Sequence, residues 1–353
     1  MDITEQTPEE ITATFSLKPF QGRQIFQWIH RRQVWNFDNM TDLSKDLRRQ
    51  LAETCHLPLL KLEQRMESQR SPGTAKMLFR LRDGLAVESV VIRDKDRVTF
   101  CLSTQVGCAV RCAFCATGLS GFKRNLSAGE IVEQALQLVA IENIKERNPN
   151  IVYMGMGEPF RNYDAVIRSI RLLSHPQGLN IGSRRITVST AGEIDGIRRF
   201  SEEGWQVRLS ISLHAATDEL RSQLVPLNRK YPLKLLMQAV RDYVEKTGRH
   251  VTFEWVLLAG VNDMPEQARA LARLVRHLTC TVNLIPYNSV PSLSYRAPSQ
   301  KICKVFRTIL EDEGVKCTLR KERGTDIDAA CGQLMCKDQE RVVAQATPIV
   351  GNT

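Results

Sequence analysis

The feature that most limits how this chain can fold is a regular alternation of strands and helices that starts near residue 101. Apolar stretches of strand length are separated by segments whose apolar residues follow helical spacing. The predicted strands are residues 150–156, 185–190, 207–214, 251–258, 281–287 and 315–320. Strands that alternate with helices usually pair in parallel, with the helices outside. The sequence therefore predicts an α/β fold built as an open or closed barrel of parallel strands.

Helix-start signals support this alternation. Ser127-Ala-Gly-Glu130 has the spacing of a capping box, in which the side chains at both ends bond each other's backbone N–H groups. Another helix should begin near Asp263 and Pro265, because proline suits the first turn of a helix. No repeat, low-complexity stretch or Pro/Gly linker divides residues 100–323. We therefore expect this part of the chain to form one unit.

The composition is that of a soluble globular protein with excess positive charge. Of the 353 residues, 42% are hydrophobic and 25% are charged, which is ordinary for a folded protein. The N-terminus is acidic and no stretch of about 18 apolar residues occurs, so we expect a cytoplasmic protein without a membrane span. The 49 Lys and Arg against 39 Asp and Glu give a formal charge of +10. This excess favours a polyanionic partner such as RNA or DNA.

The chain before residue 101 has a different pattern. Residues 1–70 are predicted to form a small helical module, because apolar residues follow helical spacing at 22–32 and 43–51. Residues 71–100 alternate between apolar and polar positions and predict a short β extension with a turn at Asp83-Gly84. The module gathers basic residues that face either RNA or solvent: Lys18, Arg23, Arg31, Arg32, Arg48 and Arg49.

Polar and glycine-containing motifs follow four of the predicted barrel strands. In barrels of parallel strands the reactive groups gather at the C-terminal strand ends, where the loops project. The motifs at these ends are residues 155–159, 189–192, 210–214 and 286–288. We therefore expect the chemistry of this chain on that side of the barrel.

Three cysteines lie close together in Cys108-Ala-Val-Arg-Cys112-Ala-Phe-Cys115. Their C-x3-C-x2-C spacing fits a four-iron cluster in which one iron is not bound by protein. A cluster with four thiolates mainly transfers electrons, whereas a free iron can bind and reduce a small molecule. We expect S-adenosylmethionine as that molecule.

Two simpler interpretations of these cysteines fit less well. Structural zinc needs four ligands, usually in paired C-x2-C or Cys/His elements, and no second pair follows at a suitable distance. Three neighbouring cysteines cannot all pair as disulfides, and the scatter of the ten cysteines along the chain is typical of a reducing compartment. A four-iron cluster remains the prediction.

Four segments of the sequence closely resemble one enzyme family. They are residues 100–118, 124–131, 154–159 and 323–334, and the last is the most diagnostic because generic radical enzymes lack its cysteine. The resemblance is to the radical S-adenosylmethionine methyltransferases that modify carbon 2 of adenine in 23S rRNA, and it covers nearly the whole chain. It implies a partial (β/α)6-type barrel at residues 101–335, followed by a tail at residues 336–353. It also implies one [4Fe-4S] cluster, held by Cys108, Cys112 and Cys115.

The family's chemistry explains why a cluster is needed. Carbon 2 of adenine is an electron-poor C–H centre, so ordinary polar methyl transfer should fail and a radical route is required. In the family, one S-adenosylmethionine methylates a cysteine and a second is cleaved to a radical that takes hydrogen from the S-methyl group. The resulting methylene radical adds to the ring, and a thiol then frees the product.

The resemblance assigns three residues to this chemistry. Cys331 matches the cysteine that carries the methyl group, and Cys101 matches the thiol that releases the product through a transient disulfide. Glu88 matches the base that removes the ring proton. Taken without the resemblance, Cys101 is typical of a packing thiol on an apolar strand, and Glu88 of an outward-facing strand residue. Cys336 would then rival Cys331.

The resemblance also assigns contacts to S-adenosylmethionine. The second glycine and the glutamate of the first motif, residues 155–159, match the pair that meets the amino group, where a carboxylate is electrostatically reasonable. The matching residues are Gly157, Glu158, Ser189, Ser212, Leu213, His214 and Asn288. Taken alone, a serine or asparagine at a strand end is typical of a helix cap, and His214 of a core residue. The remaining cysteines match nothing catalytic and are expected to be packing residues: Cys55, Cys280, Cys303, Cys317 and Cys336.

Two segments depart from the family pattern, Phe160-Arg161 and Arg320-Lys-Glu-Arg323, and we expect neither to touch a catalytic position. A sister group with the same cysteines methylates carbon 8 of the same rRNA adenine and confers antibiotic resistance, whereas overall similarity favours carbon 2. A non-catalytic iron–sulfur RNA-binding protein is a further alternative, although it would need neither Cys331 nor Cys101. The expected partners are 23S rRNA, with tRNA as a second candidate, and an electron donor such as flavodoxin. We expect a monomer.

Overall fold

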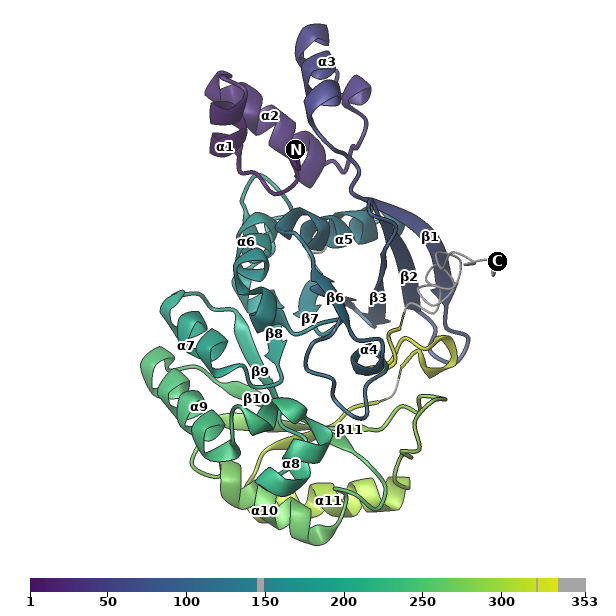
Figure 1. Ribbon diagram of the computed structural model, residues 1–353, viewed down its shortest axis with the longest axis vertical. Helices are drawn as coiled ribbons and strands as arrows, with labels where there is room; N and C mark the ends of the chain where they lie inside the picture. Colours follow the sequence, from purple (N-terminus) through teal and green to yellow (C-terminus); the bar gives the residue numbers. More distant parts are fainter. Residues whose placement is uncertain (145–148, 322, 336–353) are drawn as a thin grey trace, which may run out of the picture.

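The computed structural model describes residues 1–144, 149–321 and 323–335, so the expected tail at 336–353 lies outside the described residues. Its centre is a ten-stranded sheet in the order β1-β2-β3-β4-β7-β8-β9-β10-β11-β12 (Figure 1). From β4 onward, neighbouring strands run parallel. These strands are β4 (Arg97–Cys101), β7 (Asn150–Tyr153), β8 (Ile186–Thr190), β9 (Arg208–Ser212), β10 (Val251–Leu257), β11 (Cys280–Pro286) and β12 (Cys317–Leu319).

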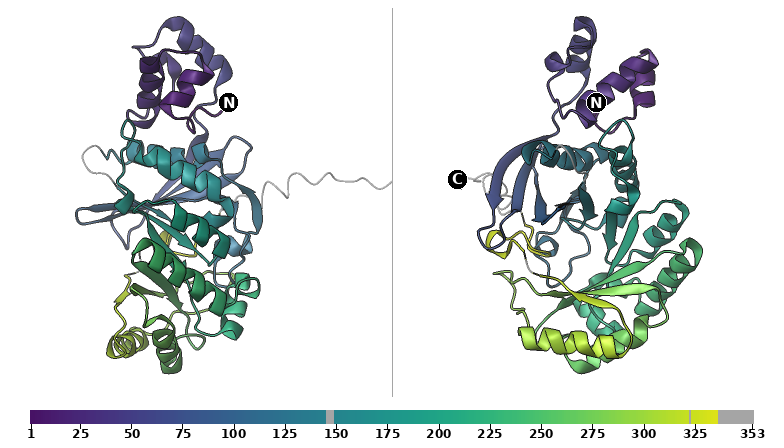
Figure 2. Two further views of the ribbon diagram at one scale, coloured as in Figure 1. Left: turned by 90° about the vertical axis from the view of Figure 1, so that its left-hand side faces the viewer. Right: turned by 180° about the vertical axis from the view of Figure 1, so that it is seen from behind.

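The parallel strands form an open barrel. The sheet does not close on itself, because β1 and β12 are the two ends of the strand order. Helices cover its outer surface, and the sheet curves around the interior in the view from behind (Figure 2). The covering helices are α5 (Ala128–Ile141), α6 (Tyr163–Ser174), α7 (Ile194–Glu202), α8 (Asp218–Leu224), α9 (Leu233–Thr247), α10 (Pro265–Val275) and α11 (Gln300–Asp312). The predicted strand-and-helix alternation and partial barrel are thus confirmed.

Local sequence explains where these elements begin. Ser127 Oγ accepts a hydrogen bond from Glu130 N at 3.0 Å, and Glu130 Oε2 accepts one from Ser127 N at 2.9 Å, which is the predicted capping box of α5. Helix α10 begins at Pro265, as predicted. Strand β10 is almost entirely buried because helices cover one face of the sheet and the barrel interior covers the other.

Three antiparallel strands extend the sheet beyond the barrel. They are β1 (Leu60–Glu67), β2 (Thr74–Leu81) and β3 (Ala86–Asp94), and β3 pairs with β4. The turn between β2 and β3 is at Asp83-Gly84, as predicted, with Gly84 in the left-handed region at φ +83° and Leu85 N donating to Asp83 Oδ1 at 3.0 Å.

Two expected boundaries differ from the structure. Residues 60–67 were expected within the helical module but form β1, because Leu60 and Leu62 place their side chains on one face of a strand that pairs with β2. Strand β4 pairs in parallel with β7, so the first barrel strand begins at Arg97, before residue 101.

The N-terminal module contains α1 (Pro8–Thr14), α2 (Pro19–His30) and α3 (Lys45–Thr54), and it lies at one end of the molecule (Figure 1). Polar contacts join it to the barrel. Arg168 Nε on α6 donates to Glu5 O at 2.9 Å, and Ser127 Oγ donates to Asp2 Oδ2 at 3.2 Å. Among the helices of the described ranges, none has the length and apolar character needed to cross a membrane.

Candidate active site

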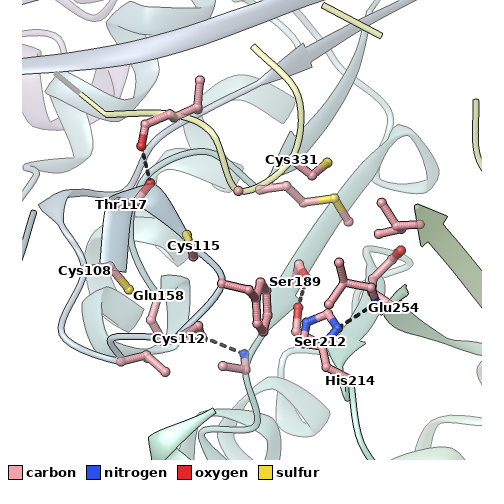
Figure 3. Close-up of a pocket in the computed structure, with 18 of the residues that line it drawn as sticks. Cys108, Cys112, Cys115, Thr117, Glu158, Ser189, Ser212, His214, Glu254 and Cys331 are labelled. Carbon is pink, nitrogen blue, oxygen red and sulfur yellow. Dashed lines mark hydrogen bonds between the residues drawn. The ribbon is translucent and has the colours of Figure 1, made fainter. Parts of the chain in front are cut away.

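The three cysteines of the predicted cluster line a cavity of about 170 Å³ inside the barrel (Figure 3). They lie on the loop between β5 (Gln105–Gly107) and α4 (Ala116–Leu119), and β5 pairs with β6 (Phe122–Asn125). Cys108 N donates to Gly121 O at 3.0 Å, which holds one end of the loop. A Cβ at Gly118 would lie 2.9 Å from Cys112 O, so the close turn here requires glycine.

The thiols need positive charge to ionise in this position. Burial raises the pKa of Cys108 to about 12, and burial followed by repulsion from Cys115 and Cys108 raises the pKa of Cys112 well above its usual value. Iron ions supply the positive charge that makes thiolates stable. In the part of the chain that is described, no three His, Cys, Asp or Glu side chains converge as they would on a single ion. Three thiols that line a cavity without converging on one point suit a multi-iron cluster better than a mononuclear zinc site, in which each sulfur lies about 2.3 Å from one ion.

Gly157 and Glu158 follow β7 and also line this cavity. Gly157 has φ +105°, and a Cβ there would lie 2.6 Å from Gln105 Cβ, so only glycine fits. Glu158 is buried, and its carboxylate accepts from Phe160 N at 3.1 Å and from Ala191 N at 2.7 Å. Burial outweighs these hydrogen bonds and raises the pKa of Glu158 to about 7. A cationic ammonium in the cavity would return this carboxyl to its charged form.

Ser189 at the end of β8 and Ser212 at the end of β9 complete the polar side of the cavity, with their Oγ atoms 3.4 Å apart. His214 lies beside them and packs edge-on against Phe114, with ring centroids 4.8 Å apart. Val256 N donates to His214 Nδ1 at 3.0 Å, so the ring proton is assigned to Nε2. Burial lowers the pKa of His214 to about 3. The imidazole is therefore neutral, and its Nε2–H group is a hydrogen-bond donor.

Leu213 and Asn288 lie differently from the other residues expected at S-adenosylmethionine. The Leu213 side chain is fully buried and does not line the cavity, whereas its carbonyl accepts from Arg221 Nε at 3.1 Å. Asn288 lines a neighbouring cavity and donates from Nδ2 to Cys331 O at 3.3 Å. Asn288 Oδ1 is buried without a hydrogen-bond partner among the described residues, which suits a site that receives a polar ligand.

Cys331 lies on a C-terminal segment that crosses the cavity opening (Figure 3). The segment is fastened to the cysteine loop, because Ala116 N donates to Gly332 O at 2.7 Å and Thr117 Oγ1 donates to Leu334 O at 2.6 Å. Cys331 itself is exposed and lines both the first cavity and the neighbouring one, of about 500 Å³. Cys331, the cysteine expected to carry the methyl group, therefore borders both cavities.

Cys101, the last residue of β4, lines the second cavity only. Burial raises the pKa of Cys101 to about 12, and the nearby Cys331 adds to the shift. All cysteines in the described ranges are free thiols, so the transient disulfide stays a prediction. Cys55, Cys303 and Cys317 are buried, as expected of packing residues, and Cys336 lies outside the described residues.

Glu88 lies on β3 and lines neither cavity. It is 4% exposed and pairs with Lys76 Nζ at 2.9 Å, so it is not the outward-facing residue that strand alternation alone suggests. Its Oε2 accepts from Met335 N at 2.8 Å, which joins the β extension to the segment that carries Cys331. Burial raises the pKa of Glu88 despite the Lys76 charge.

Comparison with protein-family models matches two parts of the chain. Residues 102–274 match the "Radical SAM superfamily", and residues 1–57 match the "Ribosomal RNA large subunit methyltransferase N-terminal domain". A crystal structure of a radical SAM methyltransferase from Sphaerobacter thermophilus superposes with a TM-score of 0.91 at 46% identity, covering 95% of this chain and 99% of that one.

Two curated relatives extend the match over nearly the full length. "Probable dual-specificity RNA methyltransferase RlmN" of Geobacillus kaustophilus is 50% identical over 325 residues, which are 92% of this chain and 88% of the relative. "Probable dual-specificity RNA methyltransferase RlmN 2" of Protochlamydia amoebophila is 48% identical over 340 residues, which are 96% and 95% of the two chains. The chain belongs to the RlmN family. As a radical SAM methyltransferase of this family, it uses a four-iron cluster and S-adenosylmethionine.

One residue of the RlmN site was missed by sequence reasoning. Arg320 was expected away from catalytic positions, but its Nη1 lies 3.9 Å from Cys331 Sγ and 3.9 Å from Glu254 Oε2. This expectation was wrong, because the Arg320 side chain faces the cavity inside the barrel, whereas its neighbour Lys321 is exposed. The four-residue charged segment was the signal in the sequence, but its spacing alone does not show which charge faces inward.

Proposed function

We propose that this chain methylates carbon 2 of an adenine in 23S rRNA, and an adenine of tRNA as a second substrate. The proposal rests mainly on the position of Cys331, which lines both the cavity with the three cluster thiols and the cavity with Cys101. A thiol that must receive a methyl group in one place and lose it in another needs such a position. The names of the relatives describe RNA methyltransferases of dual specificity, which supports two RNA substrates, and the family model that matches residues 1–57 is named for ribosomal RNA of the large subunit.

The bound cluster and S-adenosylmethionine supply the radical that takes hydrogen from a methyl group. The residues of the chain carry the methyl group and release the product. Cys331 sulfur first attacks the sulfonium methyl group, and the new C–S bond forms as the old one breaks, so that the sulfur keeps the methyl as a thioether. After the carbon has joined the adenine, Cys101 sulfur attacks Cys331 sulfur. The S–S bond forms, and the electrons of the broken C–S bond go to the carbon, which takes a proton.

Glu88 is proposed to accept the proton of carbon 2 once the new bond has formed, and the unpaired electron left on the ring would pass to the bound cluster. Burial raises the pKa of Glu88, and a carboxylate with a raised pKa is a stronger base than an ordinary glutamate. In the structure the carboxylate is occupied by Lys76 and by Met335 N. We infer that the contact with Met335 opens when the ring enters, because Glu88 lines neither cavity while it is made.

The helical module is proposed to contact RNA through phosphates. Lys18, Arg23, Arg31 and Arg32 are exposed on or beside α2, and the Arg32 guanidinium stacks on Trp28 at 4.1 Å. A stacked guanidinium is held in place and keeps its donors free for phosphate oxygens. We also propose that the enzyme acts as a cytoplasmic monomer and receives electrons from a carrier such as flavodoxin.

Mass analysis of digested RNA tests the proposal. 23S rRNA and tRNA transcripts are treated with the reduced holoenzyme and S-adenosylmethionine, and methyladenosine isomers are separated against 2-methyl and 8-methyl standards. The proposal expects 2-methyladenosine in both RNAs. The 8-methyl isomer would identify a carbon-8 enzyme instead. If no methylated adenosine is formed, the remaining alternative is an iron–sulfur protein that binds RNA without modifying it.

A further inference from the structure

Arg221 on α8 is a charged side chain that is shut off from solvent. It is 0% exposed, and its guanidinium donates four hydrogen bonds. The acceptors are Ala191 O at 2.6 Å, Ser212 O at 3.3 Å, Leu213 O at 3.1 Å and Asn228 Oδ1 at 3.1 Å. All four acceptors are neutral. A buried cation that is held by neutral groups is unfavourable unless an anion lies nearby.

Two carboxylates near Arg221 do little to neutralise its charge. Asp218 lies one turn earlier on α8, but it is exposed, and its Oδ1 accepts from Asn228 Nδ2 at 2.9 Å. Solvent screens an exposed carboxylate, so its effect on Arg221 is weak. Glu158 binds Ala191 N, but it also faces the cavity, where the ammonium group of S-adenosylmethionine would pair with it. The counter-charge of Arg221 therefore has to come from elsewhere.

The cysteine loop lies against the same helix. Ala113 N donates to Leu224 O at 2.9 Å, and Leu224 is the last residue of α8, one turn after Arg221. This bond brings Cys112, the neighbour of Ala113, to the helix that carries Arg221. Burial raises the pKa of Cys112 well above its usual value, and the charge of Arg221 opposes this shift. Burial lowers the pKa of Arg221 to about 10, so the guanidinium stays charged at neutral pH.

The bound cluster would supply the missing negative charge. Its three thiolates outweigh the positive charge of the oxidised iron–sulfur core, so the cluster and its ligands together are an anion. An added electron makes this anion more negative. A buried cation stabilises a neighbouring anion strongly, because little solvent lies between them to screen the attraction. Reduction potentials of iron–sulfur clusters depend on local charge and solvent exposure in this way.

We propose that Arg221 is the buried counter-charge of the iron–sulfur cluster and makes the cluster easier to reduce. In this step the electron donor loses one electron and the cluster gains it, while no bond forms or breaks. Arg221 does not line the cavity and acts through Cys112 and the cluster, so it is a positioning residue. The inference concerns the cluster, and it holds whichever carbon of adenine is methylated.

The variants have to separate the charge of Arg221 from its hydrogen bonds, which also hold the ends of β8 and β9. Arg221→Gln removes the charge and keeps a polar side chain, whereas Arg221→Lys keeps the charge and loses the planar donor group. Arg208→Gln is the matched control, because Arg208 is exposed at the opposite end of β9. Asp218→Asn/Asn228→Asp keeps Arg221 and the net charge but places a carboxylate against Arg221 Nη1.

Redox titration of the holoenzyme measures the effect. The anaerobically reconstituted protein is titrated with dithionite and redox mediators in the absence of S-adenosylmethionine, and the reduced cluster is counted by its electron paramagnetic resonance signal. For Arg221→Gln we expect the ratio of reduced to oxidised cluster at a fixed potential to fall about tenfold, which is about 59 mV for one electron. The ratio should fall less in Arg221→Lys and stay unchanged in Arg208→Gln. It should also fall in Asp218→Asn/Asn228→Asp.

Iron content and circular dichroism identify the variants that keep the fold and the cluster. A wild-type potential in Arg221→Gln would overturn the inference. Equal falls in Arg221→Gln and Arg221→Lys would also overturn it, because the lost hydrogen bonds would then explain the effect. If Arg221→Gln does not fold or binds no iron, the double variant decides: a lowered potential there supports the inference, and a wild-type potential overturns it.

Discussion

Arg320 Nη1 lies 3.9 Å from Cys331 Sγ, so a guanidinium stands beside the thiol at the junction of the two cavities. The same nitrogen is 3.9 Å from Glu254 Oε2, which holds the side chain toward the barrel. A positive charge beside a sulfur stabilises the anionic form that attacks a methyl group. This contact suggests that the first covalent step depends on Arg320.

Replacing Arg320 with glutamine should therefore slow reactions of the Cys331 sulfur. The pair is partly exposed, so we expect a loss of about 1 kcal/mol, or roughly fivefold, in the rate of alkylation by iodoacetamide. Arg320→Lys should keep most of the rate because it keeps the charge. The rate for Cys280 in the same protein is the internal control, and an unchanged Cys331 rate in Arg320→Gln would show that the contact has no chemical role.

The two thiols of the second cavity should give opposite phenotypes. Cys331→Ala has no methyl carrier, so neither RNA adduct nor methylated RNA should form. Cys101→Ala still loads the carrier but lacks the releasing thiol, so protein covalently joined to RNA should accumulate on denaturing gels. The double variant should form no adduct. Free methylated RNA from Cys331→Ala would overturn the mechanism, whereas the same product from Cys101→Ala would remove only the release step.

Loss of one cluster ligand should remove the iron. In Cys112→Ala the cysteine loop keeps two of its three thiols, and we expect less than about a tenth of the wild-type iron after anaerobic reconstitution, because clusters are held by their thiolates. Iron content and visible absorbance measure the effect, with Cys280→Ala as the control. Stoichiometric zinc and no iron in the wild-type protein would contradict the cluster.

The buried ion pair between Lys76 and Glu88 should be costly to break from one side. Both side chains are nearly inaccessible, so Lys76→Met leaves a buried carboxylate without its partner. We expect a loss of about 3 kcal/mol in the free energy of unfolding. Lys76→Met/Glu88→Leu should recover much of this loss because no unpaired charge remains. Thermal unfolding checks both variants, and equal midpoints for the single and double variants would disagree with this account.

Glu133 on α5 should make stability depend on pH. Its carboxylate accepts from Leu59 N at 2.8 Å and from Leu60 N at 2.9 Å, yet burial raises its pKa from 4.5 to about 7. Folding therefore takes up a proton here, and the associated stability is fully present below pH 4.5 and lost as the pH rises through 7. The full effect is about 3 kcal/mol. Between about pH 5 and 7.5, the free energy of unfolding of the wild type should fall relative to that of Glu133→Gln. If the free energies of unfolding of the two proteins change equally with pH, Glu133 is not the cause.

Local patterns predicted the elements that depend on near neighbours. The capping box of α5, the Asp83-Gly84 turn and the barrel strands follow from side chains a few positions apart, and the structure confirms them. The cysteine spacing likewise predicted three thiols on one loop, and these line one cavity.

Contacts between distant segments were not predictable in the same way. Lys76 meets Glu88 only because β2 and β3 pair in one register, and Glu88 meets Met335 across 247 positions of sequence. Arg320 reaches Cys331 because its side chain faces the cavity inside the barrel, and no spacing rule shows which residue of the charged segment does so. The position of Cys331 at two cavities also depends on this fold-back of the C-terminal segment.

The C-terminal segment is tied to the earliest strands of the sheet. Asp326 accepts hydrogen bonds from Ser68 Oγ at 2.5 Å and from Gln69 N at 2.8 Å, and Lys76 Nζ donates to Asp328 O at 3.3 Å. The cysteine loop and the barrel strands up to β11 precede residue 331 by 45 positions or more, because β11 ends at Pro286. They are therefore synthesised well before the cysteine that carries the methyl group. We expect docking of the C-terminal segment to be the step that completes the active site.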